Sequence, residues 1–96
     1  MVDTKTHPGE VLKEEYLEPL GISQADFARA IGISFQRVNE LVNEKRGVTP
    51  ETALLLSQAL DTTPEFWMNL QARYDLASFG RVQKVRSLIK SSRRAS

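Results

Sequence analysis

Residues 24–41 read QADFARAIGISFQRVNEL and predict two short helices joined by a tight turn. Ser23 is placed to cap the first helix, Gly32 supplies the left-handed residue that ends it, and Ser34 is the expected N-cap of the second. Apolar residues recur at helical spacing in both segments; they are Phe27, Ala28, Ile31, Val38, Leu41 and Val42. Because so short a turn cannot bring the helices antiparallel, the pattern predicts a helix-turn-helix.

An unrelated helical bundle would explain the apolar spacing of these residues but not their other features. Ala28 is small where the second helix must cross closely over the first, and Gly32 lies where the turn needs a positive φ. The combination favours a helix-turn-helix over two ordinary amphipathic helices. We therefore expect an all-α protein of five to six helices built around this motif.

Length and composition restrict the class of protein. A chain of 96 residues forms one domain, which we place at residues 7–78, after a disordered N-terminus at residues 1–6. There is no cysteine and no apolar run near the roughly 20 residues that cross a bilayer, so we expect a cytoplasmic protein with no membrane contact. His7 is the only histidine, and we expect it to be structural or a cap. Without a nucleophile–base pair or a metal-loop spacing, we expect no enzyme, metal or cofactor.

Charge is divided unevenly along the chain. Residues 1–75 carry seven Lys or Arg against twelve Asp or Glu, a net charge of −5, whereas residues 76–96 carry six Lys or Arg and no acid, a net charge of +6. A basic tail of this kind either contacts a polyanion or is a solvated, disordered end, and the sequence leaves both open.

The segment before the motif predicts a first helix from His7 to Leu20, entered at Pro8 and ended by Pro19 and Gly21. Its expected inward stripe is Val11, Leu12, Tyr16 and Leu20. The opposite side is acidic and carries Glu10, Glu14, Glu15 and Glu18. This side is either a solvated face or a docking surface.

Two Thr-Pro-Glu start signals follow the motif and a polar loop at residues 43–48. Thr49 opens a helix whose expected core residues are Ala53, Leu54, Leu56, Ala59 and Leu60. Thr63 opens another helix, whose stripe is Phe66, Trp67, Leu70, Tyr74 and Ala77. We expect the aromatic part of this stripe to belong to the core.

Residues 79–96 form a basic segment in which apolar residues again recur at helical spacing. After a break at Gly80, the spacing predicts a last amphipathic helix, whose apolar side must be buried in the core, in a second subunit or in a partner. The candidate dimer residues are Phe79, Val82, Val85, Leu88 and Ile89. From Ser91 onward we expect disorder.

A recognition helix reads bases from its N-terminal turns, which enter the major groove most deeply. The candidate base contacts are therefore Phe35, Gln36, Arg37, Asn39 and Glu40. Gln36 offers a bidentate amide to adenine, Arg37 a fork to guanine, and each good polar pair contributes about 1–3 kcal/mol. Phe35 suits a thymine methyl group, and Glu40 either contacts a base or orients a neighbouring side chain. The candidate phosphate contacts are Gln24, Ser34, Asn43, Lys45 and Arg46.

The charge of this region is low for a protein that binds double-stranded DNA. Residues 23–47 hold four basic residues, Arg29, Arg37, Lys45 and Arg46, against three acids, Asp26, Glu40 and Glu44. One copy should therefore bind weakly. We expect a homodimer that places two recognition helices about 34 Å apart on a palindromic operator.

The same residues resemble a known group of regulators. Residues 22–64 resemble the Cro/repressor-like helix-turn-helix proteins of the lambda-repressor (XRE) type, at Gln24, Ala28, Gly32, Ser34, Val38 and Leu41. The flanks HPGEVLKEEYLEPLGIS and RGVTPETALLLSQALDTTPEFWMNLQARYDLA closely resemble the HigA (VapI-like) antitoxins, so the likeness runs from His7 to about Ala77. Its most specific part is PEFWMNLQ.

The resemblance implies a homodimeric antitoxin that represses its own operon and neutralises a HigB-type toxin, a small basic ribosome-dependent mRNA endonuclease. It also gives the acidic first helix a basic partner, with Glu10, Glu14, Glu15 and Glu18 as toxin-contact candidates. Two other interpretations stay open: an adaptor that binds proteins rather than DNA, and a solitary regulator without a toxin. A small basic nuclease encoded beside the chain would favour the antitoxin.

Overall fold

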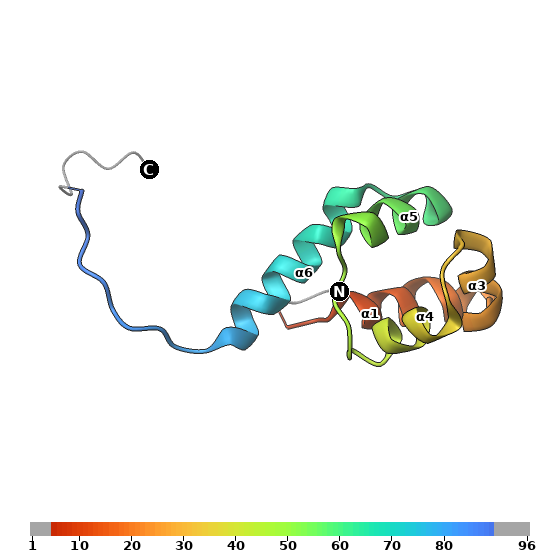
Figure 1. The fold of residues 1–96 in the computed structure, drawn as a ribbon, viewed down its shortest axis with the longest axis horizontal. Coiled ribbons are helices and arrows are strands. Elements are labelled where there is room, and N and C mark those ends of the chain that lie inside the picture. Colours follow the sequence, from red (N-terminus) through yellow and green to blue (C-terminus); the bar gives the residue numbers. More distant parts are fainter. Residues whose placement is uncertain (1–4, 90–96) are drawn as a thin grey trace.

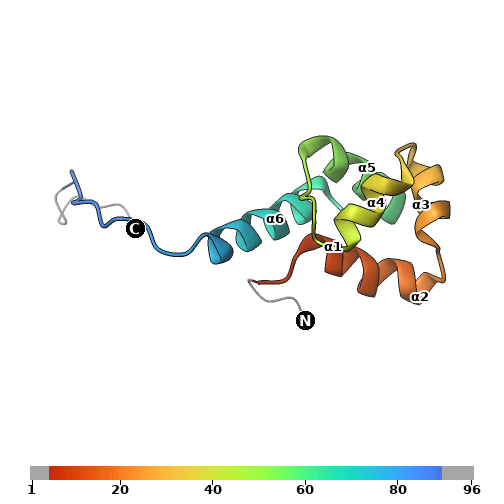
Figure 2. The ribbon, with the colours of Figure 1, turned by 60° about the horizontal axis from the view of Figure 1, so that its bottom comes forward.

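The computed structural model describes residues 5–89, and every regular element in that range is helical (Figure 1). The elements are α1 (Pro8–Val11), the π-helical turn η1 (Leu12–Leu17), α2 (Glu18–Leu20), α3 (Gln24–Ile31), α4 (Phe35–Val42), α5 (Pro50–Leu60) and α6 (Pro64–Phe79). The first three form one continuous helix, as Figure 2 shows, so residues 5–89 contain five helices. The predicted all-α class is confirmed. None of the described helices is both long and apolar enough to span a bilayer.

Each of the five helices begins with a side chain that accepts a hydrogen bond from the backbone of its first turn. The caps are His7, Ser23, Ser34, Thr49 and Thr63. Gly32 follows α3 with φ 78°, and its left-handed conformation lets the chain turn at once toward α4. The predicted starts and the predicted turn of the helix-turn-helix are therefore confirmed.

The first helix departs from the predicted α-helical phase. The N–H of Glu18 donates to the carbonyl of Lys13, five residues back, so the turn over η1 is wider than an α-helical turn. The wider turn brings Leu12 and Leu17 to the same buried face, and Leu20, predicted to face inward, is 61% exposed. Pro19 lies inside the helix rather than ending it, and the helix ends at Gly21.

The core is built around the fully buried Trp67, with Leu12, Val38 and Leu56 among the other fully buried side chains. The helix-turn-helix stripe joins it as predicted, since Phe27, Ala28, Val38, Leu41 and Val42 are buried and Ile31 packs against them. The prediction for α5 was partly wrong. Leu54 and Ala59 are exposed, and the buried positions beside Ala53 and Leu56 are Thr52 and Ser57. Because α5 is apolar on more than one side, hydrophobicity alone did not identify its inner face.

The predicted last helix is absent, because α6 ends at Phe79 and residues 80–89 contain no helix. Figure 1 shows this segment leading away from the helices. Its apolar residues, from Val82 to Ile89, are all exposed. A helix of about ten residues is marginal in water unless it packs on another surface, and the described chain offers this segment none. Disorder was also predicted from Ser91 onward and for residues 1–6; the former range and residues 1–4 of the latter lie outside the described residues.

Candidate nucleic-acid interface

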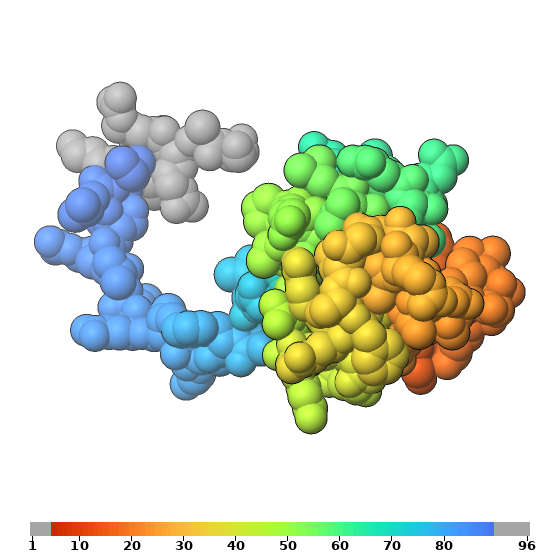
Figure 3. Space-filling model, turned by 45° about the vertical axis from the view of Figure 1, so that its right-hand side comes forward, coloured from red at the N-terminus to blue at the C-terminus, as the bar shows by residue number. Residues whose placement is uncertain are grey.

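Helices α3 and α4 lie together on one face of the molecule, with the loop after α4 at its edge (Figure 3). The hydroxyl of Ser34 accepts from the N–H of Arg37 at 3.1 Å and so fixes the first turn of α4. Phe35, the first residue of the helix, is 53% exposed. This end of α4 can therefore enter a groove without unfolding any part of the core.

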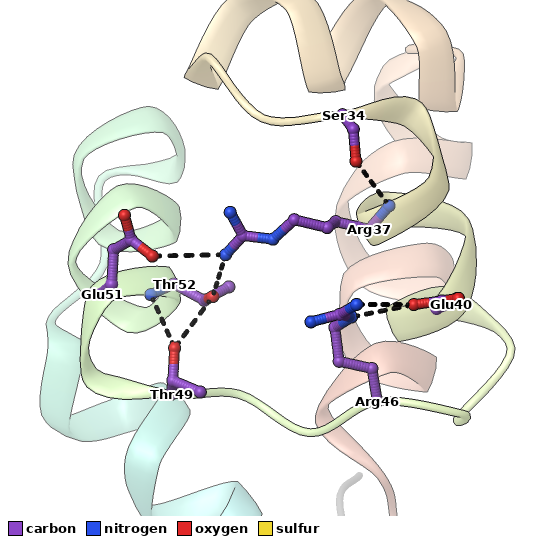
Figure 4. A network of polar contacts seen from close by, with 7 residues as sticks. All are labelled: Ser34, Arg37, Glu40, Arg46, Thr49, Glu51 and Thr52. Atoms are coloured by element: carbon purple, nitrogen blue, oxygen red, sulfur yellow. Dashed lines mark hydrogen bonds and ion pairs between the residues drawn. The ribbon is translucent and has the colours of Figure 1, made fainter.

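Glu40 is the centre of a polar chain along the outer side of α4. One of its carboxylate oxygens accepts from Nε and Nη2 of Arg46, at 3.0 and 2.8 Å, as Figure 4 shows. The other oxygen accepts from Nε2 of Gln36 at 3.1 Å. The bonds from Arg46, and then the bond from Gln36, lower the pKa of the Glu40 carboxyl below its ordinary value. Glu40 is therefore a carboxylate at neutral pH, with both oxygens engaged.

Arg37 extends from α4 to the first turn of α5 (Figure 4). Its Nη2 lies 3.3 Å from a carboxylate oxygen of Glu51 and 3.3 Å from the hydroxyl oxygen of Thr52. The Thr52 hydroxyl in turn lies 3.2 Å from that of Thr49, the cap of α5. This bridge makes Arg37 a brace between α4 and α5, whatever contact it makes with a base.

A second brace joins α4 to α3. The Nδ2 of Asn39 donates to Oε1 of Gln24 at 3.0 Å, and both side chains are half-buried. Because the carbonyl oxygen of Gln24 is engaged, its NH₂ group is the part left to donate to a phosphate. The pair fixes the crossing of the two helices at the edge that would face DNA.

The remaining phosphate candidates lie after α4. Asn43 and Lys45 are exposed, and the ammonium group of Lys45 forms no ion pair within the described residues. By contrast Arg29, Arg37 and Arg46 are each paired, with Asp26, Glu51 and Glu40 in turn. Asp26 and Glu40 were already counted in the composition of residues 23–47, and the pair with Glu51 adds a further acid, so the predicted weak positive field is weaker still.

The loop that carries Arg46 is held at both ends. At its start, the N–H of Lys45 donates to the carbonyl of Glu40 at 2.8 Å and the N–H of Glu44 to that of Leu41 at 3.0 Å, a Schellman pattern with Glu44 at φ 63°. At its end, Val48 is buried and its N–H donates to Oε1 of Gln71 at 2.7 Å. Arg46 is therefore presented by backbone of fixed conformation.

Two parts of this arrangement were not predicted. Glu51 and Thr52 are 14 and 15 residues from Arg37, and Gln71 is 23 residues from Val48, so no local spacing announces these contacts. The contact between Gln36 and Glu40 did have a signal, because residues four apart meet on one side of a helix. The sequence pattern therefore predicted that the five candidate base contacts lie on one helix, but it did not predict the residues from other elements that hold them.

The acidic side of the first helix is largely solvent-facing. Glu14, Glu15 and Glu18 are exposed and Glu10 is half-buried, while Lys13 pairs with Glu18 at 3.3 Å. His7, at the start of this helix, is buried and its Nδ1 accepts from the N–H of Gly9 at 2.9 Å, so the predicted capping role is confirmed. Among the residues that the structure describes, no three His, Asp or Glu side chains lie together as a metal site would require.

Comparison with known proteins agrees with this geometry. The family described as Helix-turn-helix matches residues 13–67. Virulence-associated protein I of Dichelobacter nodosus is 47% identical over 70 residues, which is 73% of this chain but 65% of that protein, so the chain spans less than two thirds of this relative. Antitoxin HigA-1 of Vibrio cholerae is 45% identical over 80 residues, covering 79% of this chain and 74% of that one. The structure of Pseudomonas aeruginosa antitoxin HigA with the higBA promoter superposes with a TM-score of 0.77 at 44% identity, covering 78% and 82% of the two chains.

Proposed function

Because the chain belongs to the helix-turn-helix family, with HigA antitoxins among its relatives, we propose that it is a sequence-specific DNA-binding repressor and the antitoxin of a toxin–antitoxin pair. The observation that carries the proposal is the recognition helix α4, whose capped and exposed N-terminal end is braced by α3 and α5. The 44% identity to an antitoxin whose structure was solved with its promoter supports it. Such a protein acts in the cytoplasm by occluding the promoter of its own operon, and it has no enzymatic step.

The proposed base contacts are the outward side chains of α4. One N–H of the Gln36 amide is held by Glu40, which leaves its carbonyl oxygen and its second N–H for an adenine edge. Phe35 is exposed enough to meet a thymine methyl group, and Arg37, Asn39 and Glu40 complete the set. The proposed phosphate contacts are the Gln24 amide, the N-terminal turn at Ser34, and the exposed loop residues that follow α4, Asn43, Lys45 and Arg46.

The direct test is fluorescence anisotropy on a labelled duplex from immediately upstream of the chain's own reading frame, with a scrambled duplex as comparison. Wild type should bind the native duplex in preference, and Gln36→Ala should lose about 1–3 kcal/mol of that preference. Lys45→Ala is the matched control, because removal of a phosphate contact weakens both duplexes alike. Equal, weak binding of wild type to both duplexes would contradict the repressor and favour a protein-binding adaptor.

We also propose that the protein binds DNA as a homodimer through its C-terminal segment. Phe79, Val82, Val85, Leu88 and Ile89 are each between 58% and 91% exposed, an apolar series that a second copy would cover. Sedimentation of wild type should give a dimer, and Phe79→Asp with Val82→Asp should give a monomer that retains its helical spectrum. A dimer that survives both substitutions would place the interface elsewhere.

The proposed toxin surface is the acidic side of the first helix. Glu14, Glu15 and Glu18 are exposed there, with Glu10 beside them, and a basic endonuclease would complement them. Charge reversal at Glu14 and Glu15 should weaken binding of the product of the adjacent reading frame while leaving operator affinity unchanged. Absence of any toxin gene beside the chain would favour the solitary regulator.

A further inference from the structure

We propose that Arg46, which lies outside the recognition helix, is a positioning residue that sets the base preference of Gln36 through Glu40. The proposal rests on the proposed function and names a determinant of its specificity. The three side chains are joined in series, since Arg46 forks onto one oxygen of Glu40 and Gln36 donates to the other.

The fork determines what Glu40 can do. Nε and Nη2 of Arg46 both donate to the same carboxylate oxygen, at 3.0 and 2.8 Å, and these two charge-assisted bonds hold that oxygen more firmly than a single bond would. The Glu40 side chain is 29% exposed and Arg46 44%, so the pair is shielded from water on part of its surface. Because Arg46 takes one oxygen and Gln36 donates to the other, the amino group of a cytosine would have to compete with Gln36 for that second oxygen.

The held carboxylate in turn orients the amide. Glu40 accepts one of the two N–H groups of the Gln36 Nε2 atom at 3.1 Å. The carbonyl oxygen and the other N–H remain, and these are the acceptor and donor that a glutamine presents to the N6 and N7 atoms of adenine. Without Arg46, Glu40 can rotate, release Gln36 and accept from cytosine itself, so adenine loses its advantage.

The position of Arg46 is itself fixed, which is what makes it a determinant rather than a mobile surface cation. The Schellman turn at Glu44 sets the start of its loop, and Gln71 of α6 holds the backbone two residues beyond it. Gly47 packs against the same Gln71, with a Cβ there falling 2.9 Å from the Gln71 oxygen. A guanidinium presented on such a loop keeps its geometry before DNA arrives.

Arg46→Lys separates positioning from simple phosphate binding. Lysine keeps the positive charge but cannot reproduce the two-pronged bond. If Arg46 acted only as a phosphate contact, its substitution would change affinity uniformly across DNA sequences. If it positions Gln36, the lysine variant loses discrimination at one base pair while the salt dependence of binding is kept.

The experiment uses the full chain and the labelled upstream duplex, competed with duplexes that carry every single base-pair change. The base pair read by Gln36 is the one at which Gln36→Ala loses discrimination. Arg46→Lys should reduce discrimination at that same pair by about tenfold and leave the other pairs within about twofold. Lys45→Ala is the control from the same loop and should leave the preference at every pair unchanged.

A double-mutant cycle completes the test. In a Glu40→Ala background, Arg46→Lys should have no further effect on the preference at the Gln36 base pair, because the connecting group is gone. An unchanged preference in Arg46→Lys, with helical content and Tm equal to wild type, would overturn the proposal and leave the repressor intact. An additive effect in the Glu40→Ala background would overturn it as well. If wild type fails to prefer the native duplex over the scrambled one, the proposed function fails and this proposal fails with it.

Discussion

Gly9 should be sensitive to any added side chain, because it touches the backbone of the recognition helix. A Cβ at residue 9 would lie 1.7 Å from the carbonyl oxygen of Leu41 and 2.7 Å from its carbonyl carbon. The obstacle is backbone, so no rotamer change relieves it, and α1 and α4 must separate by more than an ångström. Overpacking of this kind costs about 1–3 kcal/mol, and we expect Gly9→Ala to reach the upper end. For a chain of this size that lowers the Tm by roughly 12 °C or more.

The sign of the effect makes the test decisive. In an ordinary helix interior, replacing Gly by Ala stabilises by about 1 kcal/mol, so helix propensity alone predicts a higher Tm. Gly47→Ala is the control, because there the added atom meets only the end of the Gln71 side chain, at 2.9 Å. Thermal and urea unfolding, followed by circular dichroism, should rank wild type above Gly47→Ala and Gly47→Ala above Gly9→Ala. A Tm for Gly9→Ala at or above that of wild type would refute the close approach of α1 and α4.

Two further predictions concern a cap and a turn. Burial lowers the pKa of His7 from its ordinary 6.5. As the pH falls, the unfolded chain therefore takes up a proton on His7 before the folded chain does. The free energy of unfolding should fall as the pH drops below about 6.5, until the pH passes the pKa of His7 in the folded protein. The variant His7→Asn keeps a side chain that can cap the helix but does not titrate. Urea titrations of this variant from pH 8 down to 5 should no longer show the fall in the free energy of unfolding. An equal fall in the variant would mean that other groups cause it. Glu44 has φ 63°, so Glu44→Gly should raise the free energy of unfolding by about 1 kcal/mol, whereas Glu44→Val should lower it. A variant with glycine that unfolds more easily than wild type would contradict the Schellman turn.

The features that the sequence predicted well are those set by neighbours within four residues. A serine or threonine cap bonds the N–H three residues on, and the left-handed turn at Gly32 closes on the carbonyl of Ala28. Such contacts form whatever the rest of the chain does. The starts of the helices and the helix-turn-helix could therefore be read before any tertiary contact was known.

The features that it missed depend on more than the spacing of apolar residues. The π-helical turn moved Leu17 to the core in place of Leu20, because a single wider turn shifts the phase of every later residue. The amphipathic pattern from Val82 to Ile89 satisfied the spacing of a helix but had no surface to pack on. The spacing of apolar residues predicts the buried face of a helix only where the helix is regularly α-helical and another element is present to cover that face.

In the candidate site, too, local spacing predicted some features and missed those that other elements supply. This difference affects how the protein would select DNA. The outward residues of α4 were predictable, but the contacts that hold them come from α3, from α5 and from the loop after α4. Three of the four cations in residues 23–47 form ion pairs with carboxylates, namely Arg29 with Asp26, Arg37 with Glu51 and Arg46 with Glu40, so Lys45 is the cation of that stretch without an ion pair in the described part of the chain. Phosphate attraction, which supplies essentially all of non-specific binding, is therefore small for one copy. In the proposed dimer, affinity would come from side chains already held in the geometry of base readout and from two such helices acting together. A repressor built in this way is selective chiefly because it binds other DNA poorly.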